Sequence, residues 1–299
     1  MNQKLTPSTA MLLIIPPLLW AGNAVVGRMV SELIPPITLN FFRWAIAFAI
    51  LLPFGFSIFR KGSGLWQSRK RFALLGLLGI GLYNALQYMA LHTSTPINVT
   101  LVGASMPVWM LLVGTLFFKT KVAGKQVAGA VLSVGGVLIV LGHGDLQQLL
   151  ALQFVIGDLF MVVASIVWAF YSWLLIQSTD TEALRRSWAT FLLAQISFGV
   201  VWSGALAAGE WTLTTSQIQW GWPLAAALIY VVVGPAIIAF RCWGLGVQRA
   251  GPSTAGFFNN LTPLFAALMS SAFLREMPHG YHAVAFALIV SGIILSSRR

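Results

Sequence analysis

One arginine, Arg43, lies inside the apolar stretch PPITLNFFRWAIAFAILLPFGF at residues 35–56, where its charge demands an explanation. A guanidinium at that depth in a membrane is costly unless it faces protein or water. If it faces a wet cavity, it would attract ligands that carry a carboxylate. The alternatives are that it snorkels outward or caps helix carbonyls for structure alone. Arg241, about five residues from the end of another apolar stretch, is better placed for anchoring.

Two tryptophans, Trp20 and Trp168, are each predicted near the middle of an apolar stretch, although tryptophan usually gathers at membrane interfaces. Their indole N–H groups need hydrogen-bond partners there. The nearby polar side chains are Asn23 and Tyr171, each three residues after a tryptophan, and Tyr83 and Gln87, which share one helix face. Aromatic walls with a few hydrogen-bonding groups are typical of a small-molecule pocket. The alternative is an aromatic core that binds nothing.

Two prolines, Pro107 and Pro263, are also predicted to lie within apolar helices. Proline cannot donate to the carbonyl four residues earlier, so each helix should bend and leave a carbonyl free, at Gly103 and at Asn259. Asn259 and Asn260 add adjacent polar groups, which favours a cavity at the bend. A packing kink without ligand contact is the alternative.

Chemistry of other kinds finds little support in the sequence. The four histidines are predicted near one surface, and they offer no convincing metal site; they are His92, His143, His279 and His282. No HExxH motif, paired intramembrane aspartates or plausible Ser–His pair falls within the apolar stretches. We therefore expect neither an enzyme nor a cofactor nor a metal.

The elements that must position these residues follow from composition. The chain has 299 residues, of which 58% are hydrophobic and only 8% charged, against roughly a quarter charged in globular proteins. Apolar runs of about 20 residues, enough to cross a bilayer, recur throughout. The fold class is an all-α membrane protein held in lipid. Ten transmembrane helices are predicted, at 10–30, 36–58, 71–92, 97–118, 122–141, 155–177, 187–208, 222–245, 252–274 and 279–297.

The net charge of +11 is interpreted as a topology signal and not as a nucleic-acid surface, because the basic residues lie between the apolar runs. Fourteen of them fall on the side of the termini, namely Lys4, Arg60, Lys61, Arg69, Lys70, Arg71, Lys119, Lys121, Lys125, Arg185, Arg186, Arg249, Arg298 and Arg299. Only Arg28 and Arg275 fall opposite. Both termini are therefore predicted to be cytoplasmic, in the inner (plasma) membrane.

A weak internal repeat relates the two halves of the chain. Residues 94–141 match residues 250–297 at an offset of 156, which superposes Pro96 on Pro252, Pro107 on Pro263 and Gly124 on Gly280. At an offset of 148, Trp20 superposes on Trp168. Each half, 1–145 and 146–299, holds five predicted helices. Because five is odd, the halves must be inverted in the membrane, a design used by transporters.

These features resemble the EamA-type drug/metabolite transporter superfamily over essentially the whole chain. The resemblance rests on the 5+5 repeat, on LLWAGN, PPITLNFFRWAIAFAILLP and GLLGIGLYNALQYMAL in the first three predicted helices, and on the P…G…G pattern that ends each half. Within the superfamily the chain is similar to YddG-type exporters of aromatic amino acids. One departure is that Glu276 fits the acidic position found in family repeats, whereas Thr120 occupies its repeat equivalent.

The sequence thus favours an alternating-access transporter, and the resemblance implies that it exports small amphipathic metabolites such as aromatic amino acids. An intramembrane enzyme and a channel or scaffold are the alternatives of other classes. The oligomeric state is left open, with a monomer among the options.

Energy coupling is predicted from where the acidic side chains fall. All seven lie in connections or near helix ends, namely Glu32, Asp145, Asp158, Asp180, Glu182, Glu210 and Glu276. Proton-driven carriers usually hold a titratable group in the path. We therefore expect a facilitator, or uniporter, with a proton-coupled exporter as the alternative and Asp158 as its most plausible coupling residue.

Overall fold

The computed structural model describes residues 5–94, 96–153, 155–177, 181–185, 187–214, 217–274 and 280–297. Within these ranges the chain is helical and contains no β-strand. Nine of its helical segments are long and apolar enough to cross a membrane. They coincide with nine of the ten predicted spans. The remaining predicted span, 252–274, is not among these nine segments, so the count of ten stays a prediction.

The first half of the chain contains α1 (Pro7–Met29), α2 (Pro36–Gly55), η1 (Phe56–Phe59), α3 (Arg69–Gly76), η2 (Leu77–Leu82), α4 (Tyr83–Thr93), α5 (Pro96–Gly103), α6 (Met106–Phe118) and α7 (Gly124–Leu141). The second half contains α8 (Leu146–Leu150), α9 (Ile156–Leu175), α10 (Glu182–Arg185), α11 (Trp188–Leu213), α12 (Trp222–Val231), η3 (Val232–Ile238), α13 (Ala239–Ala250), α14 (Pro252–Phe258), α15 (Leu261–Leu274) and α16 (Gly280–Ser297).

Two long helices each contain a π-helical segment, η2 between α3 and α4 and η3 between α12 and α13. The first ends at Leu82 and the second at Ile238, which is 156 residues later. A π-turn frees backbone carbonyls from their α-helical partners. Side chains of neighbouring helices use them: Asn40 Nδ2 donates to Ile80 O at 2.8 Å, and Trp20 Nε1 donates to Pro235 O at 3.3 Å.

The helices that carry the two predicted bends are interrupted at corresponding places. A turn at 104–105 separates α5 from α6, and a turn at 259–260 separates α14 from α15. Pro107 occupies the first turn of α6, where proline is well tolerated, so the helix restarts there instead of bending through it. Pro263 is the third residue of α15. The Asn259 carbonyl accepts the backbone N–H of Thr262 at 2.9 Å, so this carbonyl is not spare.

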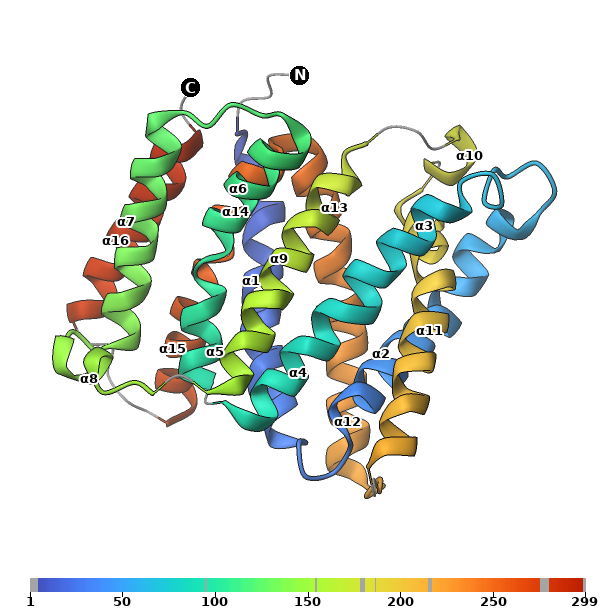
Figure 1. The fold of residues 1–299 in the computed structure, drawn as a ribbon, viewed down its shortest axis with the longest axis horizontal. Coiled ribbons are helices and arrows are strands. Elements are labelled where there is room, and N and C mark those ends of the chain that lie inside the picture. Colours follow the sequence, from blue (N-terminus) through green and yellow to red (C-terminus); the bar gives the residue numbers. More distant parts are fainter. Residues whose placement is uncertain are drawn as a thin grey trace.

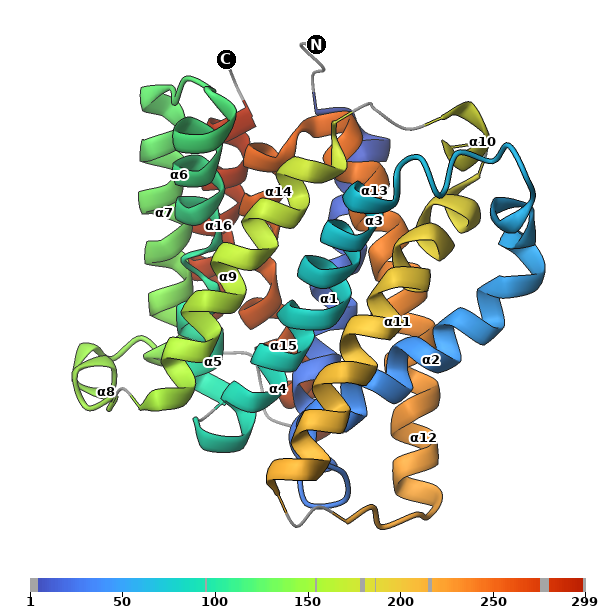
Figure 2. The same ribbon diagram turned by 45° about the vertical axis from the view of Figure 1, so that its right-hand side comes forward.

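The last helix of each half packs against the other, α7 against α16. Their backbones approach closely through glycines: a Cβ at Gly129 would lie 2.7 Å from Gly292 O, and a Cβ at Gly292 would lie 2.6 Å from Gly129 O. Such contacts between small residues are a common way for membrane helices to associate. In Figures 1 and 2 this pair stands at one end of the molecule, and α2, α11 and α12 stand at the other.

α1 and α9 run through the middle of the molecule between these two groups (Figure 1). α1 begins and α16 ends at the upper edge of the view, whereas α8 lies at the lower edge. The two ends of the described chain are thus on one side, as ten crossings would require. That this side is cytoplasmic stays a prediction.

Candidate functional site

An aromatic cluster lies where the central helices meet, with Trp168 of α9 in its middle. The Trp168 ring has its centroid 5.3 Å from Trp20 of α1, 4.5 Å from Tyr83 of α4, 4.9 Å from Tyr171, and 5.4 and 5.5 Å from Phe240 and Trp243 of α13. Trp168 is fully buried, and Trp20 is 8% exposed. The structure therefore brings together four of the aromatic residues singled out in the sequence, Trp20, Tyr83, Trp168 and Tyr171.

The indole N–H groups of this cluster differ in how they are satisfied. Trp20 donates to the η3 carbonyl of Pro235, and Trp243 donates to Ser172 Oγ at 3.1 Å. Trp168 Nε1 is buried without a hydrogen-bond acceptor. An unpaired buried donor is unusual in proteins and calls for an explanation, such as a ligand or water that fills the gap.

Arg43 is fully buried on α2 and points into the protein. Its Nη1 donates to Asn84 Oδ1 at 2.9 Å, to the Tyr88 hydroxyl at 3.0 Å and to Asn23 Oδ1 at 3.3 Å. The Tyr88 hydroxyl in turn donates to Asn23 Oδ1 at 2.9 Å. Arg43 thus neither snorkels outward nor caps a helix carbonyl, and its hydrogen bonds are to neutral side chains of α1 and α4.

Unsatisfied donors surround this arginine. Arg43 Nε and Nη2, Trp44 Nε1 and Asn84 Nδ2 are all buried without a partner. The Trp44 ring lies 4.7 Å from Phe240, which itself contacts Trp168, so these donors and Trp168 Nε1 belong to one region. An arginine has only donors, whereas a carboxylate has only acceptors. A carboxylate or several waters would satisfy this set.

The remaining predicted site residues are placed differently. Gln87 is buried on α4, one turn beyond Tyr83. Asn260 is fully buried and donates to Ser133 Oγ of α7 at 2.9 Å, so its contact is with the α7–α16 end of the molecule. Asn259 lies in the same turn, and its Nδ2 is buried without a partner. Pro107 packs against Gly256 of α14.

Two groups of residues escaped the sequence analysis. Phe240 and Trp243 follow η3 and complete the aromatic cluster, and Asn84 and Tyr88 complete the surroundings of Arg43. The rule applied to Trp20 does not single out Trp243, because Trp243 lies near the end of the predicted span 222–245, where tryptophan is common. Asn84 could have been found as a polar neighbour of Tyr83. Nothing in the sequence shows that Phe240 faces inward.

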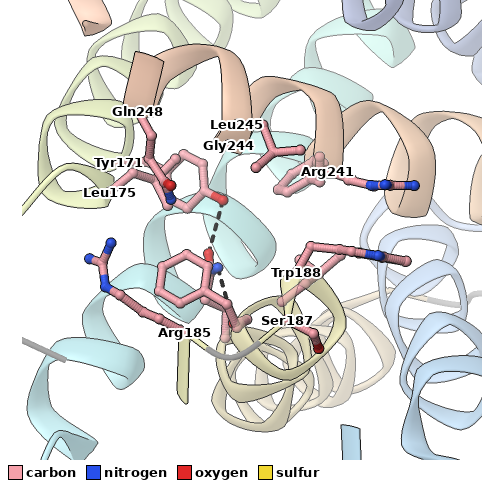
Figure 3. A pocket seen from close by; sticks show the side chains of 13 residues that line it. Tyr171, Leu175, Arg185, Ser187, Trp188, Arg241, Gly244, Leu245 and Gln248 are labelled. Atoms are coloured by element: carbon pink, nitrogen blue, oxygen red, sulfur yellow. Dashed lines mark hydrogen bonds between the residues drawn. The ribbon is translucent and has the colours of Figure 1, made fainter. Parts of the chain in front are cut away.

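A cavity of about 120 Å³ lies beside the aromatic cluster (Figure 3). Its lining comes from α9, α10, α11 and α13, and consists of Tyr171, Leu175, Arg185, Ser187, Trp188, Phe191, Leu192, Gln195, Phe240, Arg241, Gly244, Leu245 and Gln248. The Tyr171 hydroxyl donates to Gln195 Oε1 at 2.9 Å across the cavity wall. Tyr171 and Phe240 belong to both the cavity lining and the aromatic cluster.

Two acidic side chains, those of Asp158 and Glu210, accept hydrogen bonds from backbone N–H groups where helices begin, and so act as helix caps. Asp158 accepts the Val155 N–H at 2.8 Å and Asn98 Nδ2 at 3.1 Å, and it also accepts the hydroxyl of Ser94. Glu210 accepts two backbone N–H groups at the start of α2, from Ile37 at 3.0 Å and from Thr38 at 2.8 Å. A carboxylate at a helix N-terminus is favourable. Glu276 lies outside the described residues.

An all-helical membrane protein with a buried arginine beside an aromatic cluster fits a transporter, and comparison with known proteins agrees. The model of the EamA-like transporter family matches residues 7–142 and again residues 155–298. The chain therefore belongs to the EamA-like transporter family.

Individual relatives cover nearly the whole chain at low identity. A protein of Archaeoglobus fulgidus, named an uncharacterized transporter, is 24% identical and is aligned over 100% of this chain and 99% of its own. The aromatic amino acid exporter YddG of Ancylobacter novellus is 24% identical over 94% of this chain and 93% of its own. A crystal structure with a TM-score of 0.71 and 22% identity covers 97% of this chain and 96% of that one, which shows a shared fold.

Proposed function

We propose that this transporter exports small amphipathic metabolites, and aromatic amino acids in particular, by alternating access around the aromatic cluster. The observation that carries the proposal is the juxtaposition of two complementary surfaces. Five aromatic rings surround Trp168, and buried N–H donors without acceptors lie next to them around Arg43. An aromatic side chain joined to a carboxylate matches both. The name of the Ancylobacter relative points to the same substrate class.

Each residue then has a separate role. Trp20, Tyr83, Trp168 and Tyr171 pack against the aromatic part of the substrate, which edge and offset ring contacts favour. Arg43 pairs with the carboxylate through its unoccupied Nε and Nη2, while Asn23, Asn84 and Tyr88 hold Nη1. A bidentate guanidinium–carboxylate pair is stronger and more directional than a single contact. Gln87, one turn beyond Tyr83 on α4, is a further polar candidate for substrate contact, and Asn259 and Asn260 are candidates in the α14–α15 turn.

Alternating access follows from two halves that are inverted relative to each other. The division into 1–145 and 146–299 is supported by element bounds that recur after 156 residues: α7 spans 124–141 and α16 spans 280–297. Breaks at α5–α6 and α14–α15 provide joints where helix pieces can tilt. Rocking of equivalent halves around a central site is a known transporter mechanism.

Transport by purified protein in lipid vesicles tests the proposal. Vesicles preloaded with unlabelled phenylalanine should take up labelled phenylalanine or tryptophan by counterflow, with saturation, and vesicles without protein should not. Phenethylamine, which lacks the carboxylate, should compete poorly. Saturable counterflow separates a carrier from a channel. Failure of every aromatic amino acid in this assay, with correctly folded protein, would refute the proposed substrate class.

A further inference from the structure

The cavity beside the aromatic cluster has a definite place in the fold. It lies where α9 ends and α11 begins, beneath α10, at the same end of the molecule where α1 begins (Figures 1 and 3). The charge distribution predicts this end to be cytoplasmic. Its inner wall is made by Tyr171 and Phe240, which also contact Trp168. The cavity is thus separated from the middle of the aromatic cluster by these two rings.

The charged side chains among the described residues that line the cavity are of one sign. They are two arginines, and this described lining contains neither an aspartate nor a glutamate. Arg241 of α13 and Arg185 of α10 lie on opposite sides of the cavity (Figure 3). In a cleft with low-dielectric walls, an excess of one sign raises the local concentration of oppositely charged ligands.

Arg241 is held by an aromatic ring of the facing helix. Its guanidinium carbon lies 4.9 Å from the ring centroid of Trp188 on α11, and Trp188 lines the same cavity. Arg185 has a similar contact, 5.4 Å from the Phe191 ring, and also donates to the Gln177 carbonyl at 3.0 Å. Arg241 itself is exposed, and its contact with Trp188 links α13 to α11 at the rim of the cavity.

We propose that this cavity is a loading site that binds carboxylate-bearing aromatic molecules on the side of the termini before they reach the aromatic cluster. Arg241 attracts the carboxylate, and Trp188, Phe191 and Phe240 accept the apolar part. The Tyr171–Gln195 hydrogen bond closes the inner wall and must open for the ligand to pass. The choice of ligand rests on the proposed function, whereas the anion preference of the cavity rests on its own residues.

Charge-selective thiol labelling tests the anion preference without any transport. Gly244 lines the cavity, and a Cβ at this position would meet no atom within 4 Å, so Gly244→Cys places a thiol there without a clash. The native thiol, the single Cys242, is removed by Cys242→Ser. An anionic methanethiosulfonate reagent should react faster with this thiol than a cationic reagent of the same size.

Adding Arg241→Gln should lower the ratio of anionic to cationic labelling rates by about threefold or more, because it removes a positive charge close to the thiol. Arg69→Gln is the matched control: Arg69 is exposed at the start of α3, at the same end of the molecule and outside the cavity lining. It should leave the ratio unchanged. Addition of 3-phenylpropanoate should slow labelling of the Arg241 protein, and phenethylamine should not.

Two results would overturn the loading site: a labelling ratio that Arg241→Gln does not change, or a thiol that neither reagent reaches. A transport arm then separates this proposal from the proposed function. In vesicles, Arg241→Gln should raise the KM for phenylalanine several-fold only when substrate is offered from the side of the termini. If wild-type protein carries no aromatic amino acid but labelling still depends on Arg241, the substrate class is wrong and the anion site stands.

Discussion

Arg43 is the residue whose burial most needs a ligand, because only one of its three nitrogens is paired. Asn23, Asn84 and Tyr88 all bond Nη1, so a lysine at this position can keep part of that network and the charge. We expect Arg43→Lys to retain part of the transport activity and Arg43→Gln to lose most of it. The fork geometry that lysine lacks accounts for the partial loss.

The measurement for Arg43 is transport per correctly folded molecule, with folding judged by size-exclusion chromatography. A purely structural arginine would make both variants fold poorly. Well-folded Arg43→Gln protein with wild-type transport would remove the carboxylate role from this residue.

Trp168 and Trp20 form the second residue-level prediction. Each aromatic contact is worth about 0.5–1.5 kcal/mol, so Trp168→Ala or Trp20→Ala should weaken transport of tryptophan and phenylalanine several-fold. Trp66, which is 71% exposed, supplies the control, since Trp66→Ala should leave transport unchanged. Saturation curves for labelled substrate check this. Equal activity of all three variants would show that ring packing on α1 and α9 is not the basis of recognition.

Site residues could be predicted from the sequence only where their residue type is unusual at the predicted depth in the membrane. Trp20 and Trp168 stood out because tryptophan is unusual at mid-span, and Arg43 stood out because charge is costly there. Phe240 did not, since phenylalanine fits both lipid and protein interior. Which face of α13 turns inward depends on packing across η3, and that is a tertiary property.

At the scale of elements, the repeat extends beyond the residues that reveal it in the sequence. Matching prolines and glycines indicated the correspondence of the last helices of each half. The π-turns η2 and η3 were not predicted, although both contain glycine and the second contains Pro235. A π-turn is stabilised by what binds its released carbonyls, here Asn40 and Trp20 from other helices. Local sequence does not contain that information.

The α7–α16 contact gives a prediction for stability. Gly129→Ala would place a methyl group 2.7 Å from the Gly292 carbonyl oxygen, so the helices must move apart. Overpacking of this kind costs about 1–3 kcal/mol, and we expect a lower midpoint of thermal unfolding in detergent. Gly135 lies on the same helix, and a Cβ there meets no atom within 4 Å. Gly135→Ala should therefore be neutral or slightly stabilising; a similar loss in both variants would contradict the close contact.

At the scale of the whole molecule, the acidic side chains bear on energy coupling. Asp158 is occupied by three hydrogen bonds as the cap of α9, and Glu210 caps α2. Neither carboxylate lines the aromatic cluster or the cavity. We expect a facilitator, in which substrate leaves down its own gradient.

The facilitator prediction is checked in vesicles with equal substrate on both sides. An imposed pH gradient should produce no net accumulation. Accumulation that persists against a concentration gradient and disappears in Asp158→Asn would instead establish proton coupling. Should Asp158→Asn merely lower thermal stability while counterflow kinetics stay intact, its role as a helix cap is confirmed.

Much of the molecular architecture could be predicted from composition alone, because a chain with 8% charged residues must lie in lipid. Nine predicted spans coincide with long apolar helices. The spans 97–118 and 252–274 were each expected as one helix with a bend, yet the chain turns at 104–105 and at 259–260. A proline indicates that a helix is interrupted, but the width of the interruption depends on what its polar groups find nearby, here Ser133 of α7 for Asn260.

The tryptophan triangle at the centre of the molecule also has an optical consequence. The ring centroids of Trp20, Trp168 and Trp243 are 5.3 to 5.5 Å apart, and the rings come from three different helices, α1, α9 and α13. At such separations the electronic transitions of indoles couple, so light is absorbed by the group and not by single rings. The sign and size of the resulting circular-dichroism couplet depend on the angles between the rings. Rotation of any one of these helices during transport should therefore change the spectrum, and the protein carries an unlabelled reporter of its own motion.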